Sequence, residues 1–499
     1  MTTTQPQTAA PAPAPTAAPT TPVPTTPMQT TAPAQAPATG DVHTLRRSMK
    51  PRQLIMLSLG GAIGTGLFVG SGAAIGVAGP AIAISFLIAG LVVVLIMRMM
   101  GELVAANPSS GAFSVHAERA IGPVAGRTIG WLYWIQVVAV VAAEATAAAA
   151  ITSSAISWIP QWVAALSFMV LFTVINLAGV AKFGAFEYWF AAIKVAAVIA
   201  FLLVGVALLM GWLPGVDSPG LDNLTGHGGF MPTGITGIAA GLLIVIFAFG
   251  GTEIVAIAAA ETTDPERNTA RAVRTIVWRI LGFYVGSVLI VVAIVPWQAP
   301  GLATGPFVEV LNVANVPGAA ALMSLVIIVA LLSSLNAMLF SASRMIFSLS
   351  ERGAAPKAFS RLTAGSVPRN AVLASVAFGF VTVLINFLAP DRVLPMLLNV
   401  VGSTILVLWT FVAVSQIRLR LKARREGTED RLPLKMWCFP YLSYLALALL
   451  AAVAVLAMFD SAARNQLLAT GTLTAAIAVA SWYGCRRQSA GRGTPKPAR

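Results

Sequence analysis

Among the ionisable side chains that stand inside long apolar stretches of this chain are Glu144, Lys194 and Glu253. Charged groups are costly in such surroundings, so each one is a functional hypothesis by default. Two carboxylates and an amine can bind and release protons, so these residues are candidates for reversible proton binding. For Glu144 the alternative is a buried hydrogen bond that fixes its helix. For Lys194 the alternative is a side chain that reaches back to the aqueous interface.

The backbone offers a second kind of chemistry in residues 60–70, where five of eleven residues are glycine. Each glycine costs up to about 1 kcal/mol relative to alanine in a helix, which predicts an opened helix here. An opened helix exposes N–H groups and a positive dipole end, both of which favour an anion such as a carboxylate. We expect the N–H groups of Gly64, Thr65 and Gly66, with the Thr65 hydroxyl, to form this anion site. The alternative is close packing of helices through small residues.

A second interruption is predicted at Gly250 and Gly251, again in the middle of an apolar segment. Glu253 follows directly, where a carboxylate would meet the positive end of the resumed helix. The elements that carry these residues must therefore be helices that break at the same depth.

The composition requires a membrane protein. The 499 residues are 57% hydrophobic and 10% charged, with a mean hydropathy of +0.82. Apolar runs of about 18 or more residues indicate membrane-spanning helices. Twelve such segments occur, at residues 53–76, 81–105, 124–155, 161–181, 186–212, 234–260, 275–297, 318–350, 370–389, 393–417, 437–459 and 466–485.

The interrupted segments are the first and the sixth. This spacing predicts an all-α fold with two inverted five-helix repeats and a substrate site near the midplane, between the broken helices. In the second segment Glu102 follows Arg98 by four residues, which predicts an ion pair along one helix.

The basic residues predict the orientation. With an even number of spans and the N-terminus inside, only Arg392 and Arg464 of the 32 basic residues fall in outer loops. This asymmetry puts both termini in the cytoplasm and explains the net charge of +14 without a nucleic-acid partner.

Three parts follow from composition. Residues 1–42 form a Thr/Pro/Ala-rich tail that we expect to be disordered, residues 43–487 form the transmembrane domain, and residues 488–499 form a basic tail. The two cysteines and three histidines have no metal-ligand spacing, and we expect no metal, no cofactor and no catalytic residues.

At these residues the chain resembles the amino acid permeases of the amino acid–polyamine–organocation superfamily, in the bacterial amino acid transporter branch. The resemblance covers residues 43–487. The matching stretches are 60–70, IMRMMGE at 96–102, GWLYW at 130–134, FEYWFAAIKV at 186–195, FGGTE at 249–253, AAET at 259–262 and DPE at 264–266. The resemblance implies a LeuT-like fold, twelve helices and proton-coupled uptake of an amino acid across the plasma membrane, in contact with membrane lipids.

Within the branch the chain looks most like 4-aminobutyrate (GABA) permeases, in TEIVAIAAAE at 252–261, VPW at 295–297 and VAVSQIR at 412–418. It departs from them in its glycine-rich break at Gly64 and Gly66, and in Gly250, where they carry a bulkier residue. Both departures fall at the substrate site. They leave aromatic amino acids, proline or other neutral amino acids open as substrates.

The resemblance also implies the substrate-binding residues, which are Ala62, Ile63, Gly64, Thr65, Gly66, Phe247, Phe249 and Gly250. Carbonyl groups of Ala62, Phe247 and Gly250 would receive the substrate's amino group, and Phe247 or Phe249 would close over it. The Lys194 ammonium would occupy the place of a sodium ion in sodium-coupled relatives. A membrane sensor with a transporter fold remains a rival. An intramembrane enzyme and a channel are weaker rivals.

Overall fold

The computed structural model describes residues 1–2, 54, 56, 61, 63–109, 111–178, 180–259, 262, 264–303, 305–363 and 366–491. The chain divides into residues 1–43 and 44–499, and nearly all of the described residues belong to the second part. Apart from residues 1–2, the predicted N-terminal tail lies outside the described residues, and so does Ala62.

Helices make up all of the regular structure in the part of the chain that is described, and no β-strand occurs there. A short π-helix, η1 (Gly66–Gly70), and a short 3-10 helix, η4 (Pro300–Ala303), accompany the α-helices. The α-helices are α2 (Ser71–Ala78), α3 (Ile82–Ala106), α4 (Ala112–Ala120), α5 (Pro123–Ala155), α6 (Gln161–Leu177), α7 (Val180–Leu209), α8 (Asp222–Thr225), α9 (Gly234–Ala248), α10 (Ile254–Ala258), α11 (Pro265–Ile294), α12 (Pro306–Val313), α13 (Ala319–Glu351), α14 (Arg369–Leu388), α15 (Pro390–Arg425), α16 (Tyr441–Ala457) and α17 (Ser461–Gly491).

The helix starts follow from the sequence. Four helices begin with a proline, namely α5, α11, α12 and α15. Proline is favoured there because the first helical N–H group has no partner within the helix. The Asp264 side chain caps α11 by accepting the N–H of Arg267.

Within the described residues, seven stretches are long and apolar enough to cross a membrane: Gly66–Ala106, Pro123–Ala155, Tyr188–Leu209, Ala319–Glu351, Arg369–Leu388, Val401–Arg425 and Ala463–Gln488. Shorter apolar helices cover Gln161–Leu177, Gly234–Ala248, Gly282–Ile294 and Tyr441–Ala457. The chain is therefore a multi-pass, all-helical membrane protein. The count of twelve spans and the LeuT-like arrangement remain predictions.

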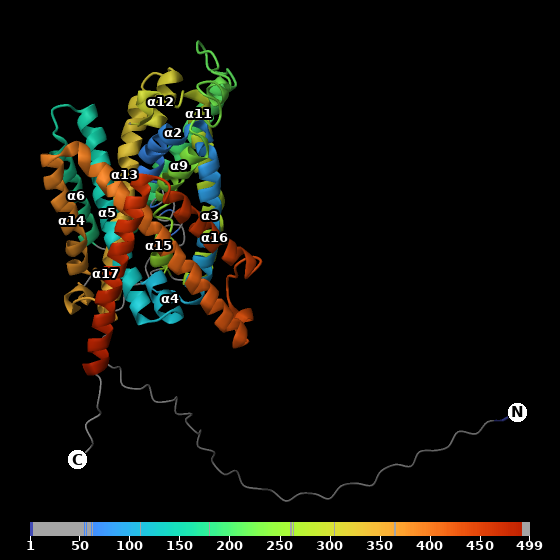
Figure 1. The fold of residues 1–499 in the computed structure, drawn as a ribbon, viewed down its shortest axis with the longest axis vertical. Helices are drawn as coiled ribbons and strands as arrows, with labels where there is room; N and C mark the ends of the chain where they lie inside the picture. The colour runs from blue at the N-terminus through green and yellow to red at the C-terminus, as the bar shows by residue number, and fades with distance from the viewer. Residues whose placement is uncertain are drawn as a thin grey trace, which may run out of the picture. The chain divides into compact units, whose positions relative to one another are not determined.

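Two long helices form the centre of the packing. Helices α5 and α13 have 33 residues each and lie against one another. At about 1.5 Å per residue each is near 50 Å long, which exceeds the roughly 30 Å of a hydrocarbon core. Figure 1 shows α6 and α14 side by side at one edge of the bundle, with α4 at one end and α12 at the other.

The predicted ion pair along α3 is corrected by the structure. The Glu102 carboxylate is buried and lies 3.1 Å from Arg420 Nη1, and it accepts the Met436 N–H at 2.6 Å and Gln416 Nε2 at 3.2 Å. Arg98 donates to the Lys435 carbonyl at 2.9 Å. The partner differs because α15 continues to Arg425, eight residues past its predicted end, and so brings Arg420 to the end of α3.

Candidate functional site

The first interruption is present between residues 63 and 70. Ile63 and Gly64 form a bend, and the chain then enters η1. The Gly64 carbonyl accepts two N–H groups, from Leu67 at 3.1 Å and from Phe68 at 3.2 Å. The glycines thus permit a tight local change of helix type, as their number in this stretch predicted.

The second interruption separates α9 from α10. Gly251 has φ of +97°, a conformation that favours glycine, and its N–H donates to Glu253 Oε2 at 3.0 Å. Glu253 is buried and directly precedes the first residue of α10. Its carboxylate therefore lies at the N-terminal end of the resumed helix, where the sequence had placed it.

The two interruptions meet in space. A Cβ atom on Gly251 would collide with the Gly61 carbonyl, and one on Gly66 would collide with the backbone of Ala248. Glycine is needed at both positions because two backbones approach closely there. The first-segment break thus lies against the break between α9 and α10.

A narrow cavity lies between the interruptions. The space free of atoms is about 290 Å³, of which water molecules could occupy only a small part. Its lining comes from both breaks and from α5, α13 and α15. The lining residues are Gly61, Gly64, Gly66, Gln136, Val140, Glu144, Phe247, Ala248, Gly250, Gly251, Met338 and Val401.

Glu144 is bound to the opened helix. Its two carboxylate oxygens accept the Thr65 N–H, each at 3.2 Å, and Oε2 also accepts the Thr65 hydroxyl at 2.6 Å. The Ser334 hydroxyl donates to Oε1 at 2.9 Å. A Cβ atom on Gly64 would strike this same carboxylate. Of the donors that we expected to hold a carboxylate, the Thr65 N–H and hydroxyl do so here, and the carboxylate belongs to the protein itself. No such bond is recorded for the N–H groups of Gly64 and Gly66, whose roles stay predictions.

Lys194 faces the interior of the bundle. The side chain is fully buried, and its Nζ donates to the Ile63 carbonyl at 3.0 Å and to the Ala330 carbonyl of α13 at 3.2 Å. The ammonium therefore ties the first interruption to α13. This position excludes a side chain that reaches the aqueous interface.

The two aromatic candidates face different surroundings. Phe247 lines the cavity beside Gly250. Phe249 stacks on Tyr284, with 4.6 Å between ring centroids, and packs edge-on against Phe86. Of the pair, Phe247 is the one that contacts the cavity.

Sequence reasoning missed several lining residues. Gln136, Val140 and Glu144 are spaced by four, which places them on one face of α5, and this period could have identified the first two. Nothing in the sequence singles out Met338 or Val401. Within the described residues, no group of three or more histidine, cysteine or acidic side chains could hold a metal ion.

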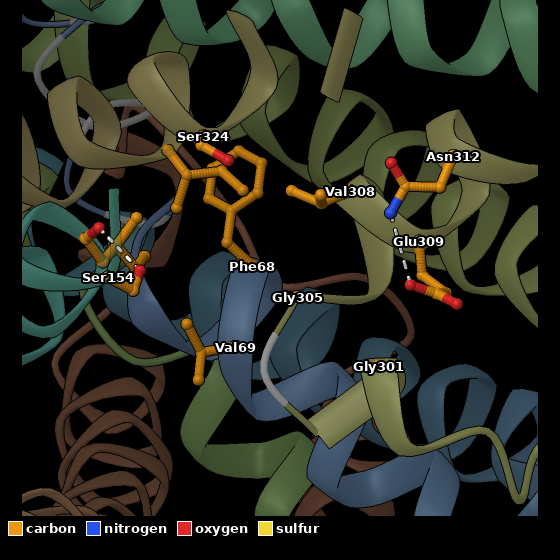
Figure 2. A pocket seen from close by; sticks show the side chains of 11 residues that line it. Phe68, Val69, Ser154, Gly301, Gly305, Val308, Glu309, Asn312 and Ser324 are labelled. Carbon is orange, nitrogen blue, oxygen red and sulfur yellow. Dashed lines mark hydrogen bonds between the residues drawn. The ribbon is translucent and has the colours of Figure 1, made fainter. Parts of the chain in front are cut away.

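A second pocket lies beyond η1. It has a volume of about 660 Å³ and is bounded by η1, α5, η4, α12 and α13. Figure 2 shows Phe68 in the middle of this pocket, with Glu309 and Asn312 together at one side. Asn312 Nδ2 donates to Glu309 Oε2 at 3.5 Å. Phe68 lines this second pocket, and Gly66, two residues earlier, lines the cavity. The two spaces are therefore neighbours across η1.

The chain is similar to known permeases over nearly its whole length. Residues 53–488 match the amino acid permease family. The chain is 44% identical to the gamma-aminobutyric acid permease of Bacillus subtilis, with 91% of this chain and 96% of the relative covered. It is 44% identical to the aromatic amino acid transport protein AroP of Corynebacterium glutamicum, with 90% and 98% covered.

A third relative is the gamma-aminobutyric acid permease of Escherichia coli, at 42% identity, with 87% of this chain and 93% of the relative covered. These relatives are transporters and not enzymes. The match to the family and the identity over most of each relative lead to one conclusion. The chain belongs to the amino acid permease family of the amino acid–polyamine–organocation superfamily.

Proposed function

We propose that this protein imports a neutral amino acid together with protons across the plasma membrane, with both termini in the cytoplasm. One observation carries the proposal. Two interrupted helices meet at a buried cavity, and a carboxylate already occupies the donors of the first interruption. Such broken helices near the midplane are typical sites for a substrate in secondary transporters.

The substrate carboxylate takes the Thr65 donors that Glu144 holds in this structure. Two carboxylates so close repel each other, and the site can accept both only when one of them is protonated. Protonation of Glu144 therefore releases Thr65 for the substrate. In this scheme, substrate binding and proton binding favour one another.

Lys194 and Glu253 are the other coupling candidates. Lys194 holds the Ile63 and Ala330 carbonyls only as a hydrogen-bond donor, and loss of its proton weakens that link between the first interruption and α13. Glu253 holds the Gly251 N–H at the second interruption. A bound proton shifts a conformational equilibrium only through a difference in affinity between the two states, and both contacts depend on conformation.

GABA or a related small amino acid is the substrate that we favour, and the cavity has to widen to admit it. The cavity is narrow, and the side chains of Val140, Phe247, Met338 and Val401 narrow it. A linear substrate would extend from the Thr65 donors toward Phe247. We place the amino group near the carbonyls of Ala62, Phe247 and Gly250, as the family resemblance implies.

An aromatic amino acid is the second candidate. Two observations favour it: the similarity to AroP, and Gly250, which places no side chain beside Phe247. A Cβ atom on Gly250 would lie 2.7 Å from Ile405 Cδ1 and 3.0 Å from the Phe247 carbonyl oxygen. A bulkier residue at this position would therefore have to displace Ile405, which packs behind Gly250.

The test is competition uptake in proteoliposomes. The purified full chain is reconstituted, and a proton gradient directed into the vesicles is imposed by acidifying the outside. Uptake of labelled GABA is then measured in the presence of each of the twenty amino acids as an unlabelled competitor. We expect gradient-dependent accumulation of GABA and competition by small neutral amino acids. Accumulation of none of them would refute import and favour a sensor. Ion conductance that continues without substrate would favour a channel.

Gly250→Met tests the specificity assignment in the same assay. We expect this variant to accept small linear substrates and to lose competition by aromatic amino acids. A competition profile that matches the parent would remove position 250 from the selectivity determinants.

A further inference from the structure

A groove that the transport cycle does not use lies between α5 and α17. It has a volume of about 690 Å³, and the segment at Gly353 and Ala354 also lines it. Its main lining residues are Arg127, Trp131, Ile135, Ile477, Ala480 and Gln488. On α5 the groove ends at Ile135, before the cavity-lining residues Gln136 and Glu144, and its lining contains none of the proposed substrate-site residues.

The groove is polar at one end and apolar along its length. At the polar end Arg127 donates to Gln488 Oε1, and Gln488 Nε2 donates to the Gly353 carbonyl at 2.6 Å. From Arg127 to Ile135 is eight helical residues, or about 12 Å. That distance covers most of one leaflet of the hydrocarbon core, which is about 15 Å deep. The groove thus has the length and polarity of a lipid molecule in one leaflet.

The groove opens toward the membrane. Only 11% of the most apolar 18-residue part of α17 is buried within the protein, so most of this helix faces lipid. Trp482 and Tyr483 are exposed near its end, and the Arg486 guanidinium lies 3.9 Å from the Trp482 ring centroid. Aromatic and basic side chains at one level are typical of the boundary between hydrocarbon and headgroups.

The local charge is positive at that level. Burial lowers the pKa of Arg352, and the nearby Arg127 guanidinium lowers it further, while the carboxylates of Glu118 and Glu351 oppose both effects. Glu118 pairs with Arg352. Arg127 and the exposed Arg486 and Arg487 remain to attract an anion.

We propose that this groove binds an anionic phospholipid. Its phosphate lies against Arg127, because guanidinium groups bind phosphate oxygens through two parallel hydrogen bonds. One acyl chain runs along Trp131, Ile135 and Ile477. Basic pockets between transmembrane helices commonly select anionic headgroups. The phosphatidylcholine headgroup has no net charge, so the groove should bind it more weakly than an anionic headgroup. The bound lipid joins α5, which carries Glu144, to the outermost helix.

The experiment is native mass spectrometry of the full chain with phosphatidylglycerol or phosphatidylcholine. We expect the parent to retain phosphatidylglycerol at least about tenfold better than phosphatidylcholine. Both lipids offer a phosphate to Arg127, but the choline cation is repelled by the surrounding arginines, each of which is worth about 1 kcal/mol near the membrane surface. Arg127→Gln should reduce that preference to near unity. Arg361→Gln, which removes an exposed basic charge outside the groove, should leave it unchanged.

A second variant tests the apolar end without touching Arg127. Ala480→Trp places a large side chain in the groove and should reduce retention of phosphatidylglycerol about tenfold, with folding checked by thermal unfolding. Equal retention of both lipids by the parent would overturn the proposal. The same lipid preference in Arg127→Gln and Arg361→Gln would also overturn it. So would crosslinks that place α17 of a second copy in the groove.

Discussion

Replacement of Glu144 by glutamine separates a coupling role from a structural one. The amide keeps the size of the carboxylate and can still accept the Thr65 hydroxyl, which donates to Oε2 at 2.6 Å. It removes the charge that would repel a substrate carboxylate. We therefore expect the variant to bind substrate without first taking up a proton.

The magnitude follows from the distance between the two carboxylates. If the substrate oxygens replace those of Glu144 at Thr65, two charges about 4 Å apart at an effective dielectric constant of about 20 repel by about 4 kcal/mol. That energy corresponds to roughly 10³-fold in affinity. The ionised parent should therefore bind substrate very weakly, while the protonated parent binds it well.

The assay is equilibrium binding of labelled GABA across pH 5 to 8 in detergent. With one linked proton, the parent Kd should rise by about tenfold per pH unit above the titration of Glu144. The Glu144→Gln Kd should be independent of pH and close to the low-pH value of the parent. Glu426→Gln is the matched control. Glu426 directly follows α15, is exposed, and pairs with Lys422 in the last turn of that helix.

Two results would refute this reasoning. A Glu144→Gln variant that keeps the pH slope of the parent would show that another group carries the proton. A variant that is folded but binds no substrate at any pH would assign Glu144 to fixing α5 against the opened helix.

The remaining predictions concern Lys194, the aromatic pair and Gly66. Lys194→Ala and Lys194→Arg should both lose accumulation driven by an imposed pH gradient but keep substrate exchange in vesicles. The arginine variant should fail because arginine does not release its proton. Accumulation by either variant would show that Lys194 is not the coupling group. Phe247→Ala should lower uptake by more than about tenfold at normal expression, and similar uptake by this variant and the parent would show that another residue closes over the substrate. Phe249→Ala should instead lower the free energy of unfolding by about 3–5 kcal/mol. Gly66→Ala should cost about 1–3 kcal/mol of stability, because its Cβ atom would meet the Ala248 backbone, and an unchanged thermal unfolding temperature would contradict that close approach.

Much of the framework was predictable because local sequence determines it. Every predicted apolar segment contains a helix in the described residues, and both glycine-rich interruptions are present. Glycine content sets where a helix opens regardless of what packs around it. Proline likewise sets where α5, α11, α12 and α15 begin.

The partners within the site were not predictable, since they depend on packing between distant segments. Thr65 and Glu144 are 79 residues apart, and no local pattern shows that one holds the other. The interruption before α10 also resets the helical phase, so spacing alone could not separate Phe247 from Phe249. The pairing of Glu102 with Arg420 depended on how far α15 continues past its apolar part.

A structure of the protein with GABA bound, determined at low pH, tests most directly whether the substrate replaces Glu144 at Thr65. We expect the substrate carboxylate to lie within hydrogen-bond distance of the Thr65 N–H and hydroxyl, and Glu144 to have withdrawn from both. A bound substrate whose carboxylate lies elsewhere, with the Glu144–Thr65 hydrogen bonds unchanged, would contradict it.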